Sequence, residues 1–188
     1  MTQHTPDRAE ALEIFLKYNK GKSLINHGKS VEAVMRYFAS KNNEDPEKWG
    51  IIGLVHDIDY EMYPEEHCQK AKEILEAAAW PEEYVRAVMS HGWGEVTDIK
   101  PETLLEKTLY AVDELCGLIT ACALVRPSKS VMDLTVKSVK KKWKVKSFAA
   151  GANREIITRG AEMLGCELPD LMADCIEGMK TVSDEIGL

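Results

Sequence analysis

The segment over residues 46–55 most constrains the fold, because it carries apolar side chains on nearly every side of a helix. Asp45-Pro46 is typical of a helix start, since the N–H that proline lacks is unpaired in the first turn anyway. An apolar surface that covers most of the circumference predicts a buried central helix. The apolar residues of this segment are Trp49, Ile51, Ile52, Leu54 and Val55. The rest of the chain must therefore pack around this helix, which leads directly into His56-Asp57.

Helical periodicity of apolar residues extends over almost the whole chain. Gly92–Lys100 is predicted to be a loop, and residues 131–139 could also be extended because four of them are β-branched. We find no internal repeat, low-complexity tract or linker. We therefore predict an all-α, single-domain helical bundle over residues 1–188. Besides the central helix, the predicted helices cover residues 7–19 and 23–42, start at Pro64 and at Pro81, and cover 101–125, 128–143, 150–165 and 169–184.

The composition is that of a water-soluble globular protein, with 45% hydrophobic and 29% charged residues in 188. Five cysteines are scattered without a CxxC pair, which argues against a disulfide framework and against a thiolate zinc site. We interpret them as small core residues in a reducing compartment. The N-terminal residues have no basic flank followed by an apolar run, and no apolar stretch approaches ~20 residues. We therefore expect a cytoplasmic protein that does not enter a membrane.

The net charge of −7 disfavours general nucleic-acid binding, which depends on neutralising phosphates. Six of the 24 basic residues nevertheless lie within residues 137–146, a stretch without any acidic residue. Such a basic patch could attract a small phosphorylated ligand, and it is equally typical of an ordinary solvated helix face. Nothing in the sequence determines the oligomeric state, so a homo-oligomer stays open.

His56-Asp57 poses a chemical problem at the end of the most apolar helix. A charged carboxylate beside an imidazole in a buried position is costly unless something compensates the charge. A divalent metal would do so, because imidazole and carboxylate together suit zinc, iron, manganese and related ions. The alternative is a His–Asp pair that forms local hydrogen bonds at the helix end.

Four further residues favour the metal interpretation. His27 lies on the preceding helix, His67 follows Pro64, and His91 ends the next predicted helix. Asp113 lies in the middle of an apolar helix face, an expensive position for a lone carboxylate, whereas the adjacent Glu114 is expected to face solvent. One or two potential ligands on each successive helix predict a single site.

The order His27…His56-Asp57…Asp113 resembles the signature of the HD-domain phosphohydrolases, an all-α superfamily of metal-dependent phosphomonoesterases and phosphodiesterases. The resemblance covers about residues 20–125, the predicted metal-binding core. Residues 126–188 form a C-terminal helical extension that resembles the tail of small bacterial HD hydrolases. The chain has Asp59 where HDIG-type members have glycine, and it lacks the lysine that often follows.

The resemblance implies that His27, His56, Asp57 and Asp113 hold one metal. His67 and His91 match the extra histidines of the two-metal branch, where the aspartate of the HD pair bridges both ions. His56 and Asp57 would then lie at the catalytic centre, and a metal-activated water would attack the substrate. Histidine-rich ligands favour iron, manganese, zinc, nickel or cobalt over magnesium, in one or two ions.

The function implied is hydrolysis of a small phosphorylated substrate, such as a nucleotide, a dinucleoside polyphosphate or another phosphoester. The alternatives are a non-catalytic HD module that binds or senses a nucleotide and, more distantly, a di-iron oxygenase. Asp59 and Glu66 could orient the imidazoles, and they could equally be helix-terminal charges. The candidate phosphate-binding residues are Arg126, Lys129, Lys137, Lys140 and Arg154, with Lys29 and Arg36 as weaker ones.

Overall fold

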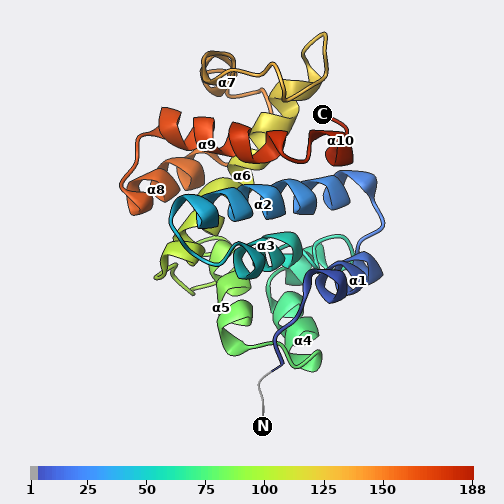
Figure 1. Ribbon diagram of the computed structural model, residues 1–188. Coiled ribbons are helices and arrows are strands. Elements are labelled where there is room, and N and C mark those ends of the chain that lie inside the picture. Colours follow the sequence, from blue (N-terminus) through green and yellow to red (C-terminus); the bar gives the residue numbers. More distant parts are fainter. Residues whose placement is uncertain (1–3) are drawn as a thin grey trace.

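The computed structural model describes residues 4–188. Over this range it contains ten α-helices, one 3-10 helix and no β-strand beyond a single bridge between Trp93 and Thr97, which confirms the all-α prediction (Figure 1). The elements are α1 Arg8–Tyr18, α2 Lys22–Lys41, α3 Pro46–Val55, η1 Pro64–Glu66, α4 Gln69–Ala77, α5 Glu82–His91, α6 Leu104–Leu124, α7 Val136–Trp143, α8 Arg154–Leu164, α9 Leu168–Lys180 and α10 Ser183–Ile186.

The apolar helix α3 lies in the core, as its sequence predicts. Every residue from Trp49 to Val55 is buried, and α3 packs along α2, which also contacts α6 and α9. In Figure 1, α9 lies on one side of α2 and α3 on the other. The close approach of α2 and α3 requires Gly53, because a Cβ there would lie 2.9 Å from Met35 Cγ and 3.0 Å from the Val31 carbonyl oxygen. The shared packing holds the end of α3, and therefore His56, against α2.

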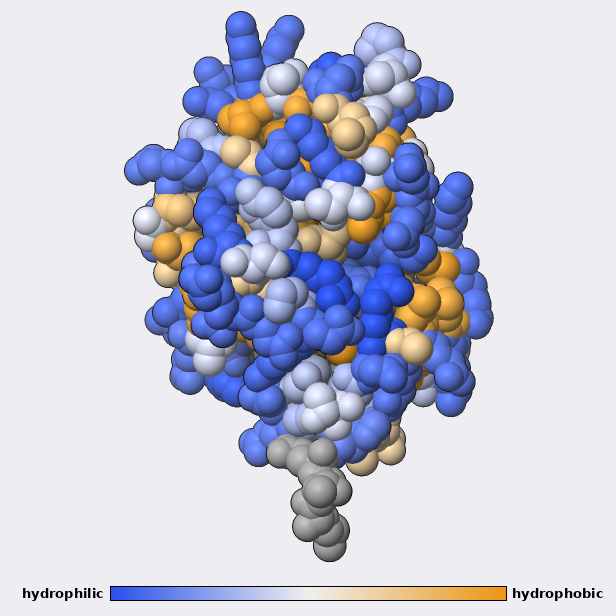
Figure 2. Space-filling model, viewed as in Figure 1, coloured by the Kyte–Doolittle hydropathy of each residue, from blue (hydrophilic) through white to orange (hydrophobic). Residues whose placement is uncertain are grey.

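One continuous hydrophobic core runs from Ala11 in α1 to Ile186 in α10. In the predicted C-terminal extension, α8 packs on α6, and α9 packs on α2. The visible face in Figure 2 is mostly hydrophilic, and its apolar patches are small and separated. Across residues 4–188, none of the helices combines the length and apolarity needed to cross a membrane.

Helix α6 starts three residues later than Pro101, the start that its sequence predicts. Thr103 accepts a hydrogen bond from the Glu106 backbone N–H, and the Glu106 carboxylate accepts from the backbone N–H of Thr103. This reciprocal capping box fixes Thr103 as the N-cap residue. The cap therefore determines the start of the helix, and the proline lies outside it.

The predicted helix 128–143 is also shorter, because α7 begins only at Val136. Asp133 accepts hydrogen bonds from the Arg126 guanidinium and the Ser128 hydroxyl, and these bonds hold the preceding residues in turns. Thr135 then caps α7 by accepting from the Ser138 N–H. Residues 131–139 contain no extended strand.

The contact between α8 and α6 yields a prediction about stability. A Cβ at Gly160 would lie 2.5 Å from the Cα and 2.6 Å from the Cβ of Ala111, so we expect Gly160→Ala to force the helices apart and cost about 1–3 kcal/mol. The matched control is Gly117→Ala in α6, where no atom lies within 4 Å and alanine should stabilise the helix by up to ~1 kcal/mol. Urea unfolding followed by circular dichroism measures both changes. Equal effects would contradict the packing argument.

Candidate metal centre

The six predicted ligands, distant in sequence, converge at one place. His27 comes from α2 and Asp113 from the middle of α6, while His91 is the last residue of α5. His56 is the C-cap residue of α3, and Asp57 follows it. His67 lies between η1 and α4. The site therefore depends on four packed helices and the turns after α3 and η1.

A first ligand set surrounds one point on the side of α2 and α6. His27 Nε2 lies 2.9 Å from Asp113 Oδ1 and 3.8 Å from Asp57 Oδ2. His56 Nε2 lies 3.3 Å from Asp113 Oδ1 and 3.4 Å from Asp57 Oδ2. These two nitrogens and two oxygens are spaced as the donors around one metal ion would be.

A second set lies on the other side of the same aspartate. His67 Nε2 and His91 Nε2 are 3.1 Å apart, and each lies 3.5 Å from Asp57 Oδ1. Asp57 thus directs one carboxylate oxygen toward each set. The two oxygens of Asp57 therefore face different pairs of imidazoles.

Hydrogen bonds fix which nitrogen each imidazole offers. The Nδ1 atoms of His56 and His91 face the backbone carbonyls of Gly53 and Val88. A carbonyl oxygen only accepts, so each Nδ1 carries the proton and donates it. Both Nε2 atoms are left to bind a cation.

His67 is oriented by a carboxylate in the same way. Its Nδ1 donates to Asp59 Oδ1 at 2.8 Å, while Asp59 Oδ2 accepts from the Ala71 N–H in the first turn of α4. Asp59 is fully buried, and its contact confirms the prediction that it orients an imidazole. Glu66 instead pairs with Lys70 on the surface and reaches no ligand.

The donor set fits a transition-metal ion by two tests. First, His56 Nε2 is buried and has no hydrogen-bond partner among the described residues, although it points at two carboxylates. Burying such an atom without a partner is costly, and a metal ligand role removes the cost. Second, imidazole and carboxylate donors together suit zinc, iron, manganese and cobalt. The described residues therefore include groups positioned to bind a metal ion.

The electrostatics of the cluster favour positive charge. Burial alone would lower the pKa of His56, but Asp57 and Asp113 outweigh it and raise that pKa to about 10. Burial likewise opposes protonation of His67, yet its bond to Asp59 raises its pKa to about 9. Burial would raise the pKa of Asp57, but His56 and His91 hold it well below its usual range. Burial also opposes ionisation of Asp113, but His56 and His27 lower its pKa, so both carboxylates are ionised and need a cation or protons nearby.

Cys68 also belongs to the site, and the sequence predicts it only as a core cysteine. Its Sγ lies 4.0 Å from His91 Nε2, and His67, Cys68 and His91 form a group spaced for metal binding. Burial raises the pKa of this thiol, but His91 and His67 outweigh the effect and lower it to about 7.

Helix α4 was expected to start at Pro64. It starts only at Gln69, because Cys68 adopts φ 67° and interrupts the helix.

A cavity of about 380 Å³ opens onto the cluster. Five of the predicted ligands line it, whereas His56 lies behind them and is fully buried. Glu114, which the sequence predicts to face solvent, also lines this cavity and accepts a hydrogen bond from the Asn153 N–H. The other lining residues are Tyr60, Pro64, Gly92, Glu95, Val96, Gly117, Gly151 and Ile156.

The cationic residues predicted to bind phosphate lie elsewhere. Arg126 pairs with Asp133, and the Arg154 guanidinium donates to the backbone carbonyls of Phe148, Ala149 and Ala152. Lys129, Lys137 and Lys140 are exposed, the last two on α7. The weaker candidates Lys29 and Arg36 line a separate surface hollow. None of these seven residues lines the cavity beside the ligands.

Comparison of the chain with family models, with curated proteins and with solved structures finds no match. The resemblance to HD-domain phosphohydrolases therefore rests on the order of the motif residues alone. The structure establishes a helical fold with a His/Asp cluster that could bind metal.

Metal content should depend on Asp57 more than on either histidine of the second set. We expect Asp57→Ala to lose all bound metal, because both sets share this carboxylate, and His67→Ala to lose no more than one ion. The control is His4→Ala, since His4 is exposed and, within residues 4–188, pairs with Glu10 and lies outside the cluster. Elemental analysis of protein purified without chelator measures the stoichiometry. Equal metal content in Asp57→Ala and wild type would contradict a shared ligand.

Metal binding should release protons and strengthen as the pH rises. His56 and His67, with pKa values of about 10 and 9, are protonated at neutral pH in the metal-free protein, and a metal must displace those protons. Calorimetric titration with zinc in two buffers of different ionisation enthalpy measures the protons released. Identical heats in both buffers would show that no protons are released and would contradict the prediction.

Proposed function

We propose that this protein is a metal-dependent phosphohydrolase acting on a small phosphorylated substrate. The observation that carries the proposal is the position of Asp57, whose two oxygens face two ligand sets beside a cavity. Two adjacent metal positions are typical of phosphatases and nucleases. The motif order His27…His56-Asp57…Asp113 supports the same class.

The chain's own residues would perform three tasks. Asp57 and Asp113 would neutralise the cations, while His27, His56, His67 and His91 would hold them through Nε2. Bound divalent ions supply a Lewis acid that polarises a phosphoryl oxygen and lowers the pKa of a water. The hydrogen bonds from His56 to Gly53 and from His67 to Asp59 keep the imidazoles in place. No serine or cysteine nucleophile is needed.

The cavity limits the substrate. Its volume of about 380 Å³ is at the lower end of ordinary ligand sites, roughly 300–1,000 Å³. No lysine or arginine stands among its lining residues, so the phosphoryl group must be held by the ions. Glu95 and Glu114 offer acceptors for hydroxyl or amino groups of the leaving portion. A small phosphoester whose leaving portion carries hydroxyl or amino groups therefore fits the cavity.

The test is phosphate release from a panel of nucleotides, sugar phosphates and an aryl phosphate, with manganese, iron, zinc, cobalt or nickel. We expect turnover with at least one metal, and a loss of ~100-fold or more in Asp57→Asn, since this ligand serves both positions. His4→Ala should match wild type. No release with any metal, or full activity of Asp57→Asn, would overturn the proposal.

Two outcomes favour the other candidate functions. Oxygen consumption by the iron-loaded protein without phosphate release would identify an oxygenase. Tight nucleotide binding without turnover of any substrate would identify a sensing module.

The basic residues of α7 should not affect substrate affinity. We expect Lys137→Ala and Lys140→Ala to change KM less than ~2-fold, because both side chains are exposed and neither lines the cavity. Steady-state kinetics on the best substrate of the panel measures this. A KM raised ~10-fold or more in either variant would place the phosphate at α7 instead.

A further inference from the structure

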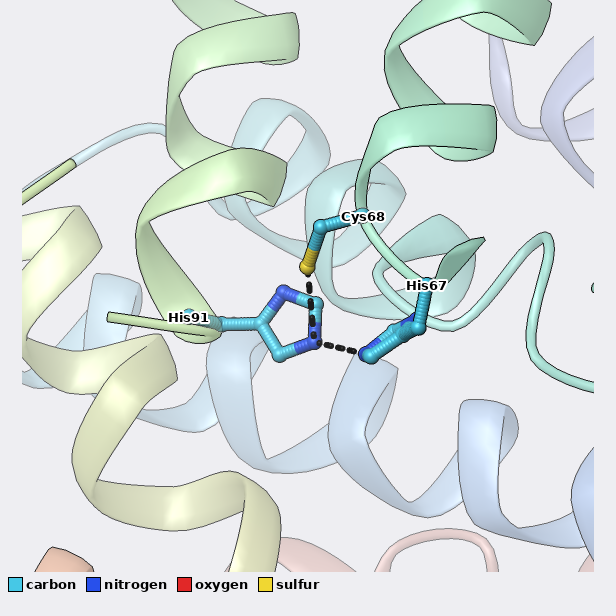
Figure 3. A group of neighbouring side chains, drawn as sticks. All are labelled: His67, Cys68 and His91. Atoms are coloured by element: carbon cyan, nitrogen blue, oxygen red, sulfur yellow. Dashed lines mark hydrogen bonds between the residues drawn. The ribbon is translucent and has the colours of Figure 1, made fainter. Parts of the chain in front are cut away.

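We propose that Cys68 is a thiolate ligand of the second metal position, which is therefore a soft site formed by Cys68, His67, His91 and Asp57. This inference rests on the proposed two-metal centre and specifies one half of it. Figure 3 shows the Cys68 sulfur and the His67 ring approaching the same nitrogen of His91.

The distances among the His67, His91 and Asp57 donor atoms match one ion, and Cys68 belongs to one group with the two histidines. Donors placed tetrahedrally at ordinary zinc–nitrogen, zinc–oxygen and zinc–sulfur bond lengths lie roughly 3.3–3.6 Å apart. His67 Nε2 and His91 Nε2 are 3.1 Å apart, and both lie 3.5 Å from Asp57 Oδ1. Cys68 Sγ lies 4.0 Å from His91 Nε2 and within 4.8 Å of a ring nitrogen of His67, so the sulfur must move inward to bind the same ion.

The surroundings of the sulfur leave room for it beside His91. A Cβ at Gly92 would lie 2.8 Å from Cys68 Sγ and 2.5 Å from Val96 Cγ2. Gly92 has φ −84° and ψ 10°, which any residue can adopt, so the lack of a side chain serves space rather than backbone conformation. The glycine that ends α5 thus allows the sulfur to lie next to the last imidazole of that helix.

Cys68 approaches the position from the protein interior. It is fully buried and is not among the residues that line the cavity, whereas His67, His91 and Asp57 are. The sulfur would therefore hold a metal from behind without touching a substrate. Among the chain's other cysteines, none belongs to a metal-binding group within residues 4–188.

A thiolate makes the two positions chemically different. The first set offers two imidazoles and two carboxylates, whereas the second would exchange one carboxylate for sulfur. Soft thiolate donors select zinc and iron over manganese and magnesium. We expect the second position to retain zinc or cobalt through dialysis that removes manganese from the first.

The experiment uses the full-length protein loaded with cobalt(II) alone. We expect a near-ultraviolet sulfur-to-cobalt charge-transfer band in wild type, its loss in Cys68→Ser, and its retention in Cys166→Ser. Cys166 is a suitable control because its thiol donates only to the Ala161 carbonyl, away from the cluster. Cobalt affinity at the second position should fall by about tenfold or more in Cys68→Ser.

A band that is absent in wild type with two cobalt ions bound, or that persists in Cys68→Ser, would overturn the assignment. If Cys68→Ser fails to fold, X-ray absorption at the zinc edge of wild type decides it, because a sulfur scatterer at about 2.3 Å is required. These readouts are independent of turnover. A charge-transfer band without phosphate release would refute only the phosphohydrolase, whereas phosphate release without a band would refute only the thiolate ligand.

Discussion

The carboxylate of Asp57 is the constraint on which this structure depends. It is only 9% exposed and follows the most apolar helix of the protein, where an uncompensated charge would be very costly. The chain compensates it with imidazoles on both sides, so that neither oxygen lacks a partner. Because α3 is buried, the surrounding helices must place cationic groups or metal ligands at its end.

This requirement links the packing of the helices to the metal-binding cluster. The helices that carry ligands are also helices that pack on one another, since α2 contacts α3 and α6, and α5 contacts α3 and α6. A metal that binds only the folded chain stabilises it by mass action, about 2.7 kcal/mol at a hundredfold excess over Kd. Without a metal, the same cluster must hold protons instead, as the raised pKa values of His56 and His67 indicate. Stability and metal binding would therefore depend on the same few contacts.

Local patterns in the sequence predict the helices and the motif residues well, because burial and periodicity are properties of neighbouring residues. Asp45-Pro46 gave a correct start for α3, and His91 ends α5 as expected. The position of Cys68 beside the histidines could not be predicted, since it depends on φ 67° and on a neighbour 23 residues away. The local sequence also did not predict which basic side chains lie near the cavity. Whether a lysine lines a cavity is decided by packing between distant helices.

In the proposed phosphohydrolase, the absence of lysine and arginine from the cavity lining would make the bound ions the means of substrate recognition. Glu95 and Glu114 lie on the cavity wall, and without ions the charges of Asp57 and Asp113 are balanced by protonated His56 and His67. Two divalent ions carry four positive charges, and the ligands Asp57, Asp113 and a Cys68 thiolate carry three negative ones. The proposed two-metal centre would therefore keep one net positive charge, at the place where a phosphoryl group would react. Such a cavity would bind its substrate only after its metals, and the acidic wall would restrict binding to molecules whose remaining part donates hydrogen bonds.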